Sequence, residues 1–331
     1  MPSSLHSRTK LTLRLAVIFL TAVTYLISGG IAIAQLYWDT NGSTAGIGGT
    51  GSISGSLWSP SAAGEVTTSN FTSGQQAIFA GTAGEVTLTG DFAPTGIAVE
   101  VSGYSFLTIN ASTRKITSNI TLTNGVDFTL APNTSNGNGQ ITIQGNITGG
   151  NSLALFGNQI TNNVGRIELT GTTPTISVPT INISGSGSVL VGFNSAVAGA
   201  AISSNVVNNT SLRFMLGATT TSNSLTYSGK ISGSGGVVFA TGVTGGEGVI
   251  TLTGGGSDYT GATHINNSIT GVVRLGVNNG LSASTALTFR GTGGNSAGAF
   301  DLAGFNQSIA SLANNDSGSV RGIVNTGAST S

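Results

Sequence analysis

The apolar residues of this chain alternate with small polar residues in short runs. Residues 86–89 read VTLT, 120–123 read ITLT, 141–144 read ITIQ and 250–253 read ITLT. A period of two places Val, Ile and Leu on one face of a strand and Thr on the other. Turn-forming clusters such as residues 254–256 (GGG) separate the runs. The pattern predicts many short, half-buried β-strands.

No window shows the period of an amphipathic helix, because Gly, Thr, Ser and Asn interrupt each candidate. Without helices to supply crossovers, a doubly wound α/β fold is excluded, and a sandwich, a barrel or a β-solenoid remains. A unit of strand, Gly turn and strand recurs at 147–153 (ITGGNSL), 183–189 (ISGSGSV) and 231–237 (ISGSGGV). This recurrence favours the solenoid, in which equivalent residues of successive coils stack.

The composition supports the same architecture. Of 331 residues, 52 are Gly and only 7% are charged. Coils stack about 4.8 Å apart, so like charges at equivalent positions would repel one another, whereas Asn and Thr can form ladders. We therefore expect an all-β solenoid with coils of roughly 20–25 residues and with Gly and Ser at the corners.

Charge and cysteine content exclude several functional classes. The chain has no Cys, which excludes a disulfide scaffold, thiolate metal sites and a Cys nucleophile. Its formal net charge is +0, so it lacks the basic surface of a nucleic-acid-binding protein. With 38% hydrophobic residues it does not resemble a disordered tail. We expect no cofactor and no nucleic-acid partner.

The N-terminal segment predicts export. Basic residues precede an apolar run at 15–27, and Ala32 and Ala34 occupy the two positions that a signal peptidase reads. A membrane anchor, the alternative, would need an apolar run of about 20 residues. We expect a signal peptide at 1–34, cleaved before Gln35. Its removal leaves a formal net charge of −3.

The C-terminal third carries a recognisable pattern, from VITLTGGGSDYTGATHI through DLAGFNQ, within residues 248–315. It resembles the autotransporter-associated β-strand repeat, also called the passenger-associated transport repeat. The matching residues are Leu252, Gly254, Tyr259, Thr260, Gly261, Ile265, Leu275, Gly276, Asp301, Leu302, Gly304, Phe305, Asn306 and Gln307. The start of the mature chain, with Trp38, Asp39, a Gly-rich stretch and Trp58, also resembles the start of such proteins.

The resemblance implies a right-handed parallel β-helix of an autotransporter passenger, at the surface of a diderm bacterium. The repeat is linked to transport and folding rather than to catalysis. Such passengers are normally followed by a translocator, so we expect a truncated repeat region at 248–331. Membrane attachment would need a separate translocator, and the protein would otherwise be periplasmic or free. The last coil edge then favours end-to-end self-association.

Between these ends we expect an N-terminal capping region and first coils at 35–110, and further coils at 111–247. Trp38, Asp39 and Trp58 are expected to close the first coil, because an open solenoid end exposes core and strand edges.

The expected function is a non-catalytic structural or adhesive role, with surface glycans or other cells as partners. The alternative is a carbohydrate-active β-helix enzyme, a polysaccharide lyase or glycoside hydrolase, or a carbohydrate-binding protein. An enzyme would need at least three converging ionisable residues, and a binding module would need aromatics in line. His264 is the only histidine of the mature chain. It has no companion at metal-ligand spacing, so we expect a solvent-facing strand residue and no metal site.

Overall fold

The computed structural model describes most of the mature chain. The described residues are 34–109, 112–132, 139–158, 166–170, 173–186, 191–195, 199–216, 223–241, 248–266, 271–290, 298–315 and 322–327. These residues contain strands β1 to β30 and no helix. Gln35–Ser331 form one compact unit. The expected signal peptide lies, apart from Ala34, outside the described residues.

The strands form three sheets. The first sheet has 13 strands, in the order β3 (Trp58–Ser59), β1 (Gln35–Trp38), β4 (Gln76–Phe79), β6 (Ile97–Val99), β9 (Ile120–Leu122), β12 (Ile147–Gly149), β15 (Thr175–Ser177), β18 (Ala200–Ile202), β21 (Ser224–Tyr227), β24 (Val249–Leu252), β26 (Val272–Leu275), β28 (Ala299–Asp301) and β30 (Gly322–Val324).

The second sheet has eight strands, β2 (Gly51–Ser52), β5 (Glu85–Leu88), β7 (Ser105–Thr108), β10 (Asp127–Ala131), β13 (Ser152–Asn158), β16 (Thr180–Ser186), β19 (Asn205–Asn208) and β22 (Ile231–Ser232). The third sheet has nine strands, β8 (Thr113–Ile116), β11 (Gln140–Ile143), β14 (Arg166–Leu169), β17 (Val191–Ser195), β20 (Ser211–Leu216), β23 (Gly236–Thr241), β25 (Thr263–Ile265), β27 (Ala286–Phe289) and β29 (Ser311–Asn314).

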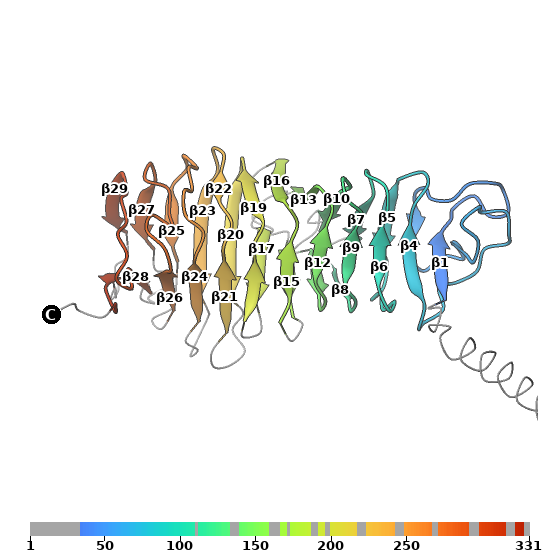
Figure 1. The fold of residues 1–331 in the computed structure, drawn as a ribbon, viewed down its shortest axis with the longest axis horizontal. Coiled ribbons are helices and arrows are strands. Elements are labelled where there is room, and N and C mark those ends of the chain that lie inside the picture. Colours follow the sequence, from blue (N-terminus) through green and yellow to red (C-terminus); the bar gives the residue numbers. More distant parts are fainter. Residues whose placement is uncertain are drawn as a thin grey trace, which may run out of the picture. The chain divides into compact units, whose positions relative to one another are not determined.

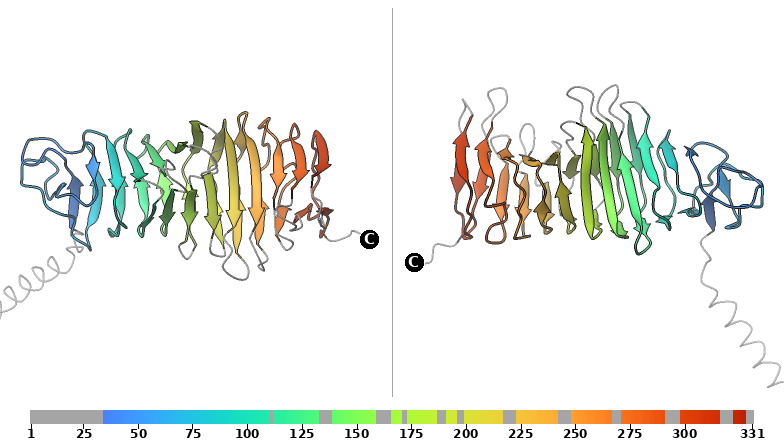
Figure 2. Two further views of the ribbon diagram at one scale, coloured as in Figure 1. Left: turned by 180° about the vertical axis from the view of Figure 1, so that it is seen from behind. Right: turned by 90° about the horizontal axis from the view of Figure 1, so that it is seen from above.

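In the middle of the stack the chain visits the three sheets in turn, and strands pair in parallel with their counterparts in neighbouring coils, except β3, which is antiparallel to β1 (Figure 1). For example, β9, β10 and β11 are followed by β12, which pairs with β9. The views from behind and above show the strands of successive coils side by side in chain order (Figure 2). This is the parallel β-solenoid expected from the sequence. Strands on either side of the expected boundaries pair with each other, β7 with β10 and β21 with β24, so the described strands form one continuous stack.

The coils vary in length more than expected. From β4 onward, paired residues of the first sheet are between 20 residues apart, as in Ala77 and Ile97, and 29 residues apart, as in Ile147 and Ile176. The longer coils keep the register of the strands and place their extra residues between strands. The expected range of 20–25 residues is therefore too narrow for the middle of the chain.

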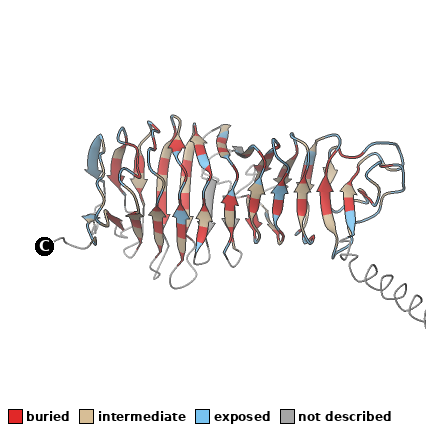
Figure 3. Ribbon diagram, viewed as in Figure 1, coloured by how far each residue is buried: buried red, intermediate tan, exposed pale blue. Residues whose placement is uncertain are grey.

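The core lies inside the coils: along many strands, buried residues alternate with less buried ones (Figure 3). In β20, Leu212, Phe214 and Leu216 are buried, and the alternate residues are partly exposed. Stacking brings identical side chains together: the rings of Phe214 and Phe239 lie 5.4 Å apart and almost parallel, at 9°. Apolar burial of this kind supplies the main stabilisation of the fold. The alternation read from the sequence thus gives the correct inward face.

Candidate functional site

The residues of the repeat motif form the contacts between coils near the C-terminal end. Leu252, Tyr259, Ile265 and Leu275 are buried in the core. Leu302 and Phe305 are partly buried against it. The remaining motif residues are glycines and polar residues, and these make contacts from one coil to the next.

Two of the glycines permit a close approach of neighbouring coils. A Cβ atom on Gly254 would overlap the carbonyl oxygen of Gly229, and one on Gly261 would overlap the carbonyl oxygen of Gly235. Both obstacles are backbone atoms of the preceding coil, so they cannot move aside cheaply. These glycines are therefore required by packing rather than by a ligand.

Tyr259 starts a buried chain of hydroxyl groups. Its hydroxyl lies 2.6 Å from Thr263 Oγ1, which lies 2.8 Å from Thr285 Oγ1. Thr285 Oγ1 donates to the carbonyl oxygen of Gly261, at 2.8 Å. Burial raises the pKa of Tyr259, although its hydrogen bonds partly oppose the shift. The neighbouring motif residue Thr260 is exposed, and its backbone N–H donates to the carbonyl oxygen of Gly233.

Asp301, which is only 1% exposed, forms hydrogen bonds with both the preceding and the following coil. Its Oδ2 accepts from Arg274 Nε in the preceding coil, at 2.9 Å, and from Thr326 Oγ1 in the following coil, at 2.6 Å. Its Oδ1 accepts from the backbone N–H groups of Ala303, at 2.9 Å, and Thr326, at 3.0 Å. Burial alone would raise the pKa of Asp301, but these donors outweigh it and lower the pKa to about 2.

The side-chain amide of Gln307 pairs with the backbone of Leu281, as a neighbouring strand would. Its Oε1 accepts from the backbone N–H of Leu281, at 3.0 Å, and its Nε2 donates to the carbonyl oxygen of Leu281, at 3.1 Å. The backbone N–H of Asn306 donates to Asn278 Oδ1, at 2.9 Å. That of Ser308 donates to Asn279 Oδ1, at 3.0 Å. The turn beyond β28 is thus bonded to the preceding coil on both sides.

Asparagine side chains also bond to the backbone of a neighbouring coil elsewhere in the stack. Asn119 Oδ1 accepts from the N–H of Asn146, and Asn146 Oδ1 accepts from the N–H of Thr175. The expected Asn ladders therefore exist, but each side chain bonds to the backbone of the next coil rather than to another Asn.

Arg274, Asn278, Asn279 and Thr326 belong to this set of contacts, and the motif comparison does not include them. An Asn-Asn-Gly turn after a strand is a signal that could have indicated two of them.

The two remaining motif glycines also contribute backbone contacts. Gly276 N–H donates to the carbonyl oxygen of Leu252, at 2.7 Å, and Gly304 N–H donates to Asn325 Oδ1, at 2.7 Å. Leu302 N–H donates to the carbonyl oxygen of Val324, at 2.8 Å. All three bonds run between neighbouring coils.

At the other end, the structure brings Trp38 and Trp58 together. β3 is the outermost strand of the first sheet and runs antiparallel to β1, with Trp58 opposite Trp38. Both indoles are fully buried, with ring centroids 5.2 Å apart and planes at 71°. Phe71, Phe79 and Phe92 pack around Trp58. This arrangement suits the predicted cap, because a strand of opposite direction ends the parallel register.

Asp39 is fully buried next to this cluster. Its Oδ1 accepts from the N–H of Asn41, at 3.1 Å. Burial raises the pKa of Asp39, and the backbone N–H groups of Asn41 and Gly42 oppose the shift. Among the described residues, Asp39 Oδ2 and Trp58 Nε1 have no hydrogen-bond partner. The sequence gives no sign of these two unpaired atoms.

Of the residues expected at the cleavage site, Ala32 lies outside the described residues and Ala34 is exposed. Gln35 is the first residue of β1, and its Nε2 donates to Gln76 Oε1 in β4, at 3.1 Å. Cleavage before Gln35 stays a prediction.

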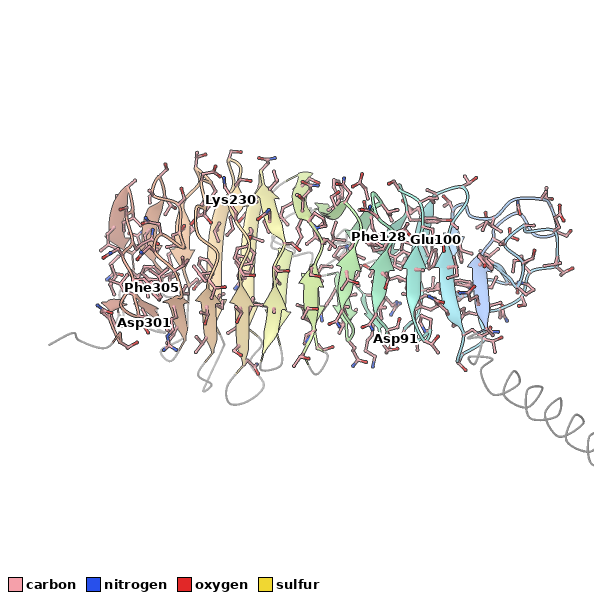
Figure 4. All side chains as sticks on the ribbon, viewed as in Figure 1. Asp91, Glu100, Phe128, Lys230, Asp301 and Phe305 are labelled. Carbon is pink, nitrogen blue, oxygen red and sulfur yellow. The ribbon has the colours of Figure 1, made fainter. Side chains whose placement is uncertain are left out.

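The ionisable and aromatic side chains that catalysis, metal binding or sugar binding would need are dispersed. No group of three or more His, Cys, Asp or Glu side chains lies together in the part of the chain that the structure describes. Asp91, Glu100 and Lys230 are spread along the stack, far from Asp301 (Figure 4). Phe156 is the only aromatic among the exposed large apolar side chains of the described residues. Within the described ranges, no helix is long and apolar enough to cross a bilayer.

His264 lies on the outward face of strand β25, as expected, and is partly exposed. Burial together with the positive charge of Arg290 lowers its pKa. Among the described residues, its Nδ1 has no hydrogen-bond partner.

Comparison with known proteins agrees with an autotransporter-like solenoid. The chain is similar to the adhesin BmaC autotransporter of Brucella suis biovar 1 (strain 1330), with 28% identity over 339 aligned residues. The match covers 91% of this chain and 9% of that protein, so the chain spans less than a tenth of its relative. No family model and no solved structure matches the chain. The resemblance to a β-helical autotransporter passenger is confirmed by the similarity to an autotransporter and by the parallel solenoid.

Replacing Trp58 by Ala should destabilise the protein by about 3–5 kcal/mol, because it removes a fully buried indole from the terminal cluster. If the cluster is a cap, amide hydrogen exchange should accelerate most in β1 and β4 and least in β26 and β28. The matched control is Phe156→Ala, since that ring is 43% exposed. Equal acceleration along the whole stack would contradict a local capping role.

Replacing Asp301 by Asn should lower the free energy of unfolding by about 2 kcal/mol near neutral pH, as the pKa is depressed from 3.8 to about 2. A depressed carboxyl pKa stabilises the protein above the unfolded pKa, and the effect disappears as pH falls through the folded pKa. The difference between wild type and variant, measured by urea unfolding, should therefore vanish between pH 4 and pH 2, approximately.

The control for this experiment is Asp258→Asn, which breaks an exposed ion pair with Lys230 and should change stability by less than about 1 kcal/mol. A loss at Asp301 that is the same at acidic and neutral pH would show that packing, and not the charge, is responsible.

Proposed function

We propose that this chain is an exported, surface-displayed solenoid segment of an autotransporter passenger, and that it acts in adhesion. The observation that carries the proposal is the similarity to an autotransporter adhesin over 91% of the chain, combined with a parallel β-solenoid. The chain covers 9% of that adhesin, and we propose that it shares the adhesive role of the larger protein.

The proposed role is non-catalytic. It is supported by the use of the motif residues, since Asp301, Gln307 and Tyr259 are committed to contacts between coils. The proposed partners are surface glycans or other cells. The proposal includes removal of residues 1–34 on export and display at the cell surface.

Deletion of residues 111–247, in frame and in the native organism, should reduce adhesion severalfold while leaving the protein on the surface. This deletion removes the middle coils and keeps both the cap and the repeat motif. The coils on either side of the deletion can then stack directly on each other. Adhesion is measured by counting bacteria bound to host cells, and display by protease accessibility of the protein on intact bacteria. Unchanged adhesion with normal display would contradict the proposal.

We also propose self-association through the end of the stack where the described strands stop. There β29 is exposed along its length (Figure 3), and Leu312 and Ile323 are 54% and 42% exposed. A cavity of about 450 Å³ opens at this end, lined by Phe289, Leu312, Ala313, Asn314, Gly322 and Ile323. Because β3 runs antiparallel at the other end, two copies would meet through like ends.

For the polypeptide of residues 1–331 after export, sedimentation velocity should show dimers that increase with concentration. Leu312→Lys with Ile323→Lys should abolish them, because like charges would then face each other across the apolar contact. The control is Phe156→Lys, an equally exposed apolar residue away from this end. Dimers that survive the double substitution, or a monomer at all concentrations, would contradict the proposal.

A further inference from the structure

The described part of the chain contains Asn-Gly pairs at 41–42, 124–125 and 279–280. In such a pair the backbone nitrogen of the glycine can attack the side-chain amide carbon of the asparagine, because glycine has no Cβ atom to obstruct the approach. The attack needs a free asparagine side chain and a glycine N–H that is exposed and not engaged in a hydrogen bond. The fold holds the three pairs in different environments.

Asp39 holds the first pair. Its Oδ1 accepts from the backbone N–H of Asn41, at 3.1 Å, and the backbone N–H of Gly42 also bonds to this carboxylate. The Nδ2 of Asn41 donates to the carbonyl oxygen of Ala45, at 3.4 Å. Both the attacking N–H and the amide that it would attack are therefore engaged.

The third pair is held by the next coil. Asn279 Oδ1 accepts from the backbone N–H of Ser308, at 3.0 Å, and the backbone N–H of Asn279 donates to the carbonyl oxygen of Asn306, at 2.8 Å. Gly280 is buried, and a Cβ atom built on it would lie 2.9 Å from Leu275 Cδ2. The N–H of Gly280 is thus shielded from the hydroxide that would have to remove its proton.

The middle pair lies in an exposed turn between β9 and β10. One hydrogen bond closes the turn, from the N–H of Val126 to the carbonyl oxygen of Thr123, at 3.0 Å, and Gly125 has a φ of +82°. Asn124 and Gly125 are exposed, and a Cβ atom on Gly125 would meet no atom within 4 Å. Among the described residues, neither the side chain of Asn124 nor the N–H of Gly125 has a hydrogen-bond partner.

We infer that Asn124 is a site of spontaneous deamidation in the folded, exported protein, with water as the only co-reactant. The Gly125 nitrogen gives its proton to hydroxide and bonds to Cγ of Asn124, the Cγ–Nδ2 bond breaks, and Nδ2 takes a proton from water and leaves as ammonia. Water then adds to one of the two carbonyl carbons of the cyclic imide and opens the ring, which leaves aspartate or isoaspartate. The net reaction exchanges one water for one ammonia, with no oxidant or reductant.

The turn can rearrange for the attack without unfolding the coil. β9, before the turn, pairs with β6 and β12, and β10, after it, pairs with β7 and β13. Val126 is buried, and its carbonyl oxygen accepts from the N–H of Asn151, at 2.7 Å. Rotation of the Asn124 backbone therefore breaks the single bond that closes the turn, while the strands on both sides stay paired.

The products change the charge and the backbone of this turn. Either product adds a carboxylate just before Asp127, at the start of a sheet whose strands contain the acids Glu85 and Asp127 but no Lys or Arg. Isoaspartate also lengthens the backbone by one carbon atom, in a coil whose register is fixed on both sides. The aged protein should be more acidic than the new one, with faster amide hydrogen exchange in the turn between β9 and β10.

The test incubates the exported chain at mildly alkaline pH, folded and, in parallel, unfolded in urea, and follows each Asn-Gly pair by peptide mass spectrometry. In the folded protein Asn124 should react at least severalfold faster than Asn41 and Asn279. In urea the three rates should converge, because only the fold distinguishes the pairs. The Asn-Gly pairs that begin at positions 136 and 138 lie at least partly outside the described residues and are followed in separate peptides.

Asn124→Gln is the variant that tests the chemistry, because a glutamine side chain closes the corresponding larger ring less readily. It should slow the reaction at position 124 severalfold and leave the thermal unfolding temperature unchanged, since the side chain of Asn124 makes no hydrogen bond to the described residues. The matched control is Asn279→Gln, which should leave the rate at Asn124 unchanged.

The reaction at Asn124 should also accelerate as the pH rises, because the glycine nitrogen attacks in its deprotonated form. A rate at Asn124 in the folded protein that is no higher than the rates at Asn41 and Asn279 would overturn the inference. The same excess at Asn124 in urea as in the folded protein would overturn it too, because the neighbouring sequence and not the fold would then select the site.

Discussion

The structure depends on the hydrogen bonds between coils. A strand of a parallel stack is satisfied only when each coil supplies N–H and C=O groups in register with the next, at a separation of about 4.8 Å. The constraint acts on every strand residue, so side chains in one column are forced into contact with their equivalents. Apolar columns such as Phe214 and Phe239 gain from this, and like charges in adjacent coils would lose. The low charge of the chain follows from the geometry of the stack.

The part of the fold that depends on short-range pattern could be predicted from the sequence. Alternation over four residues identifies an inward face in β5 or β24, because the side-chain period of a strand does not depend on its partners. Coil length could not be predicted, since extra residues between strands change it from 20 to 29 without changing the strands.

Contacts between coils were also harder to predict, because the variable coil length hides which residues become neighbours. Asp301 was identified by its motif, but its partners Arg274 and Thr326 are 27 and 25 residues away, at distances fixed only by the lengths of their own coils. The pairing of Trp38 with Trp58 was indicated by their isolation at one end of the chain. The unpaired atoms of Asp39 and Trp58 depend on side-chain packing, which no local pattern encodes.

The same constraint connects stability to recognition. A solenoid gains stability from each coil and its neighbour, so outward side chains contribute little to folding and can vary. Residues that hold the stack, such as Asp301 and Gln307, bond along the stacking direction between coils. Outward residues of one register column, such as Arg213, Val238 and His264, lie in successive coils. A repeating scaffold therefore presents its outward side chains at the spacing of its coils.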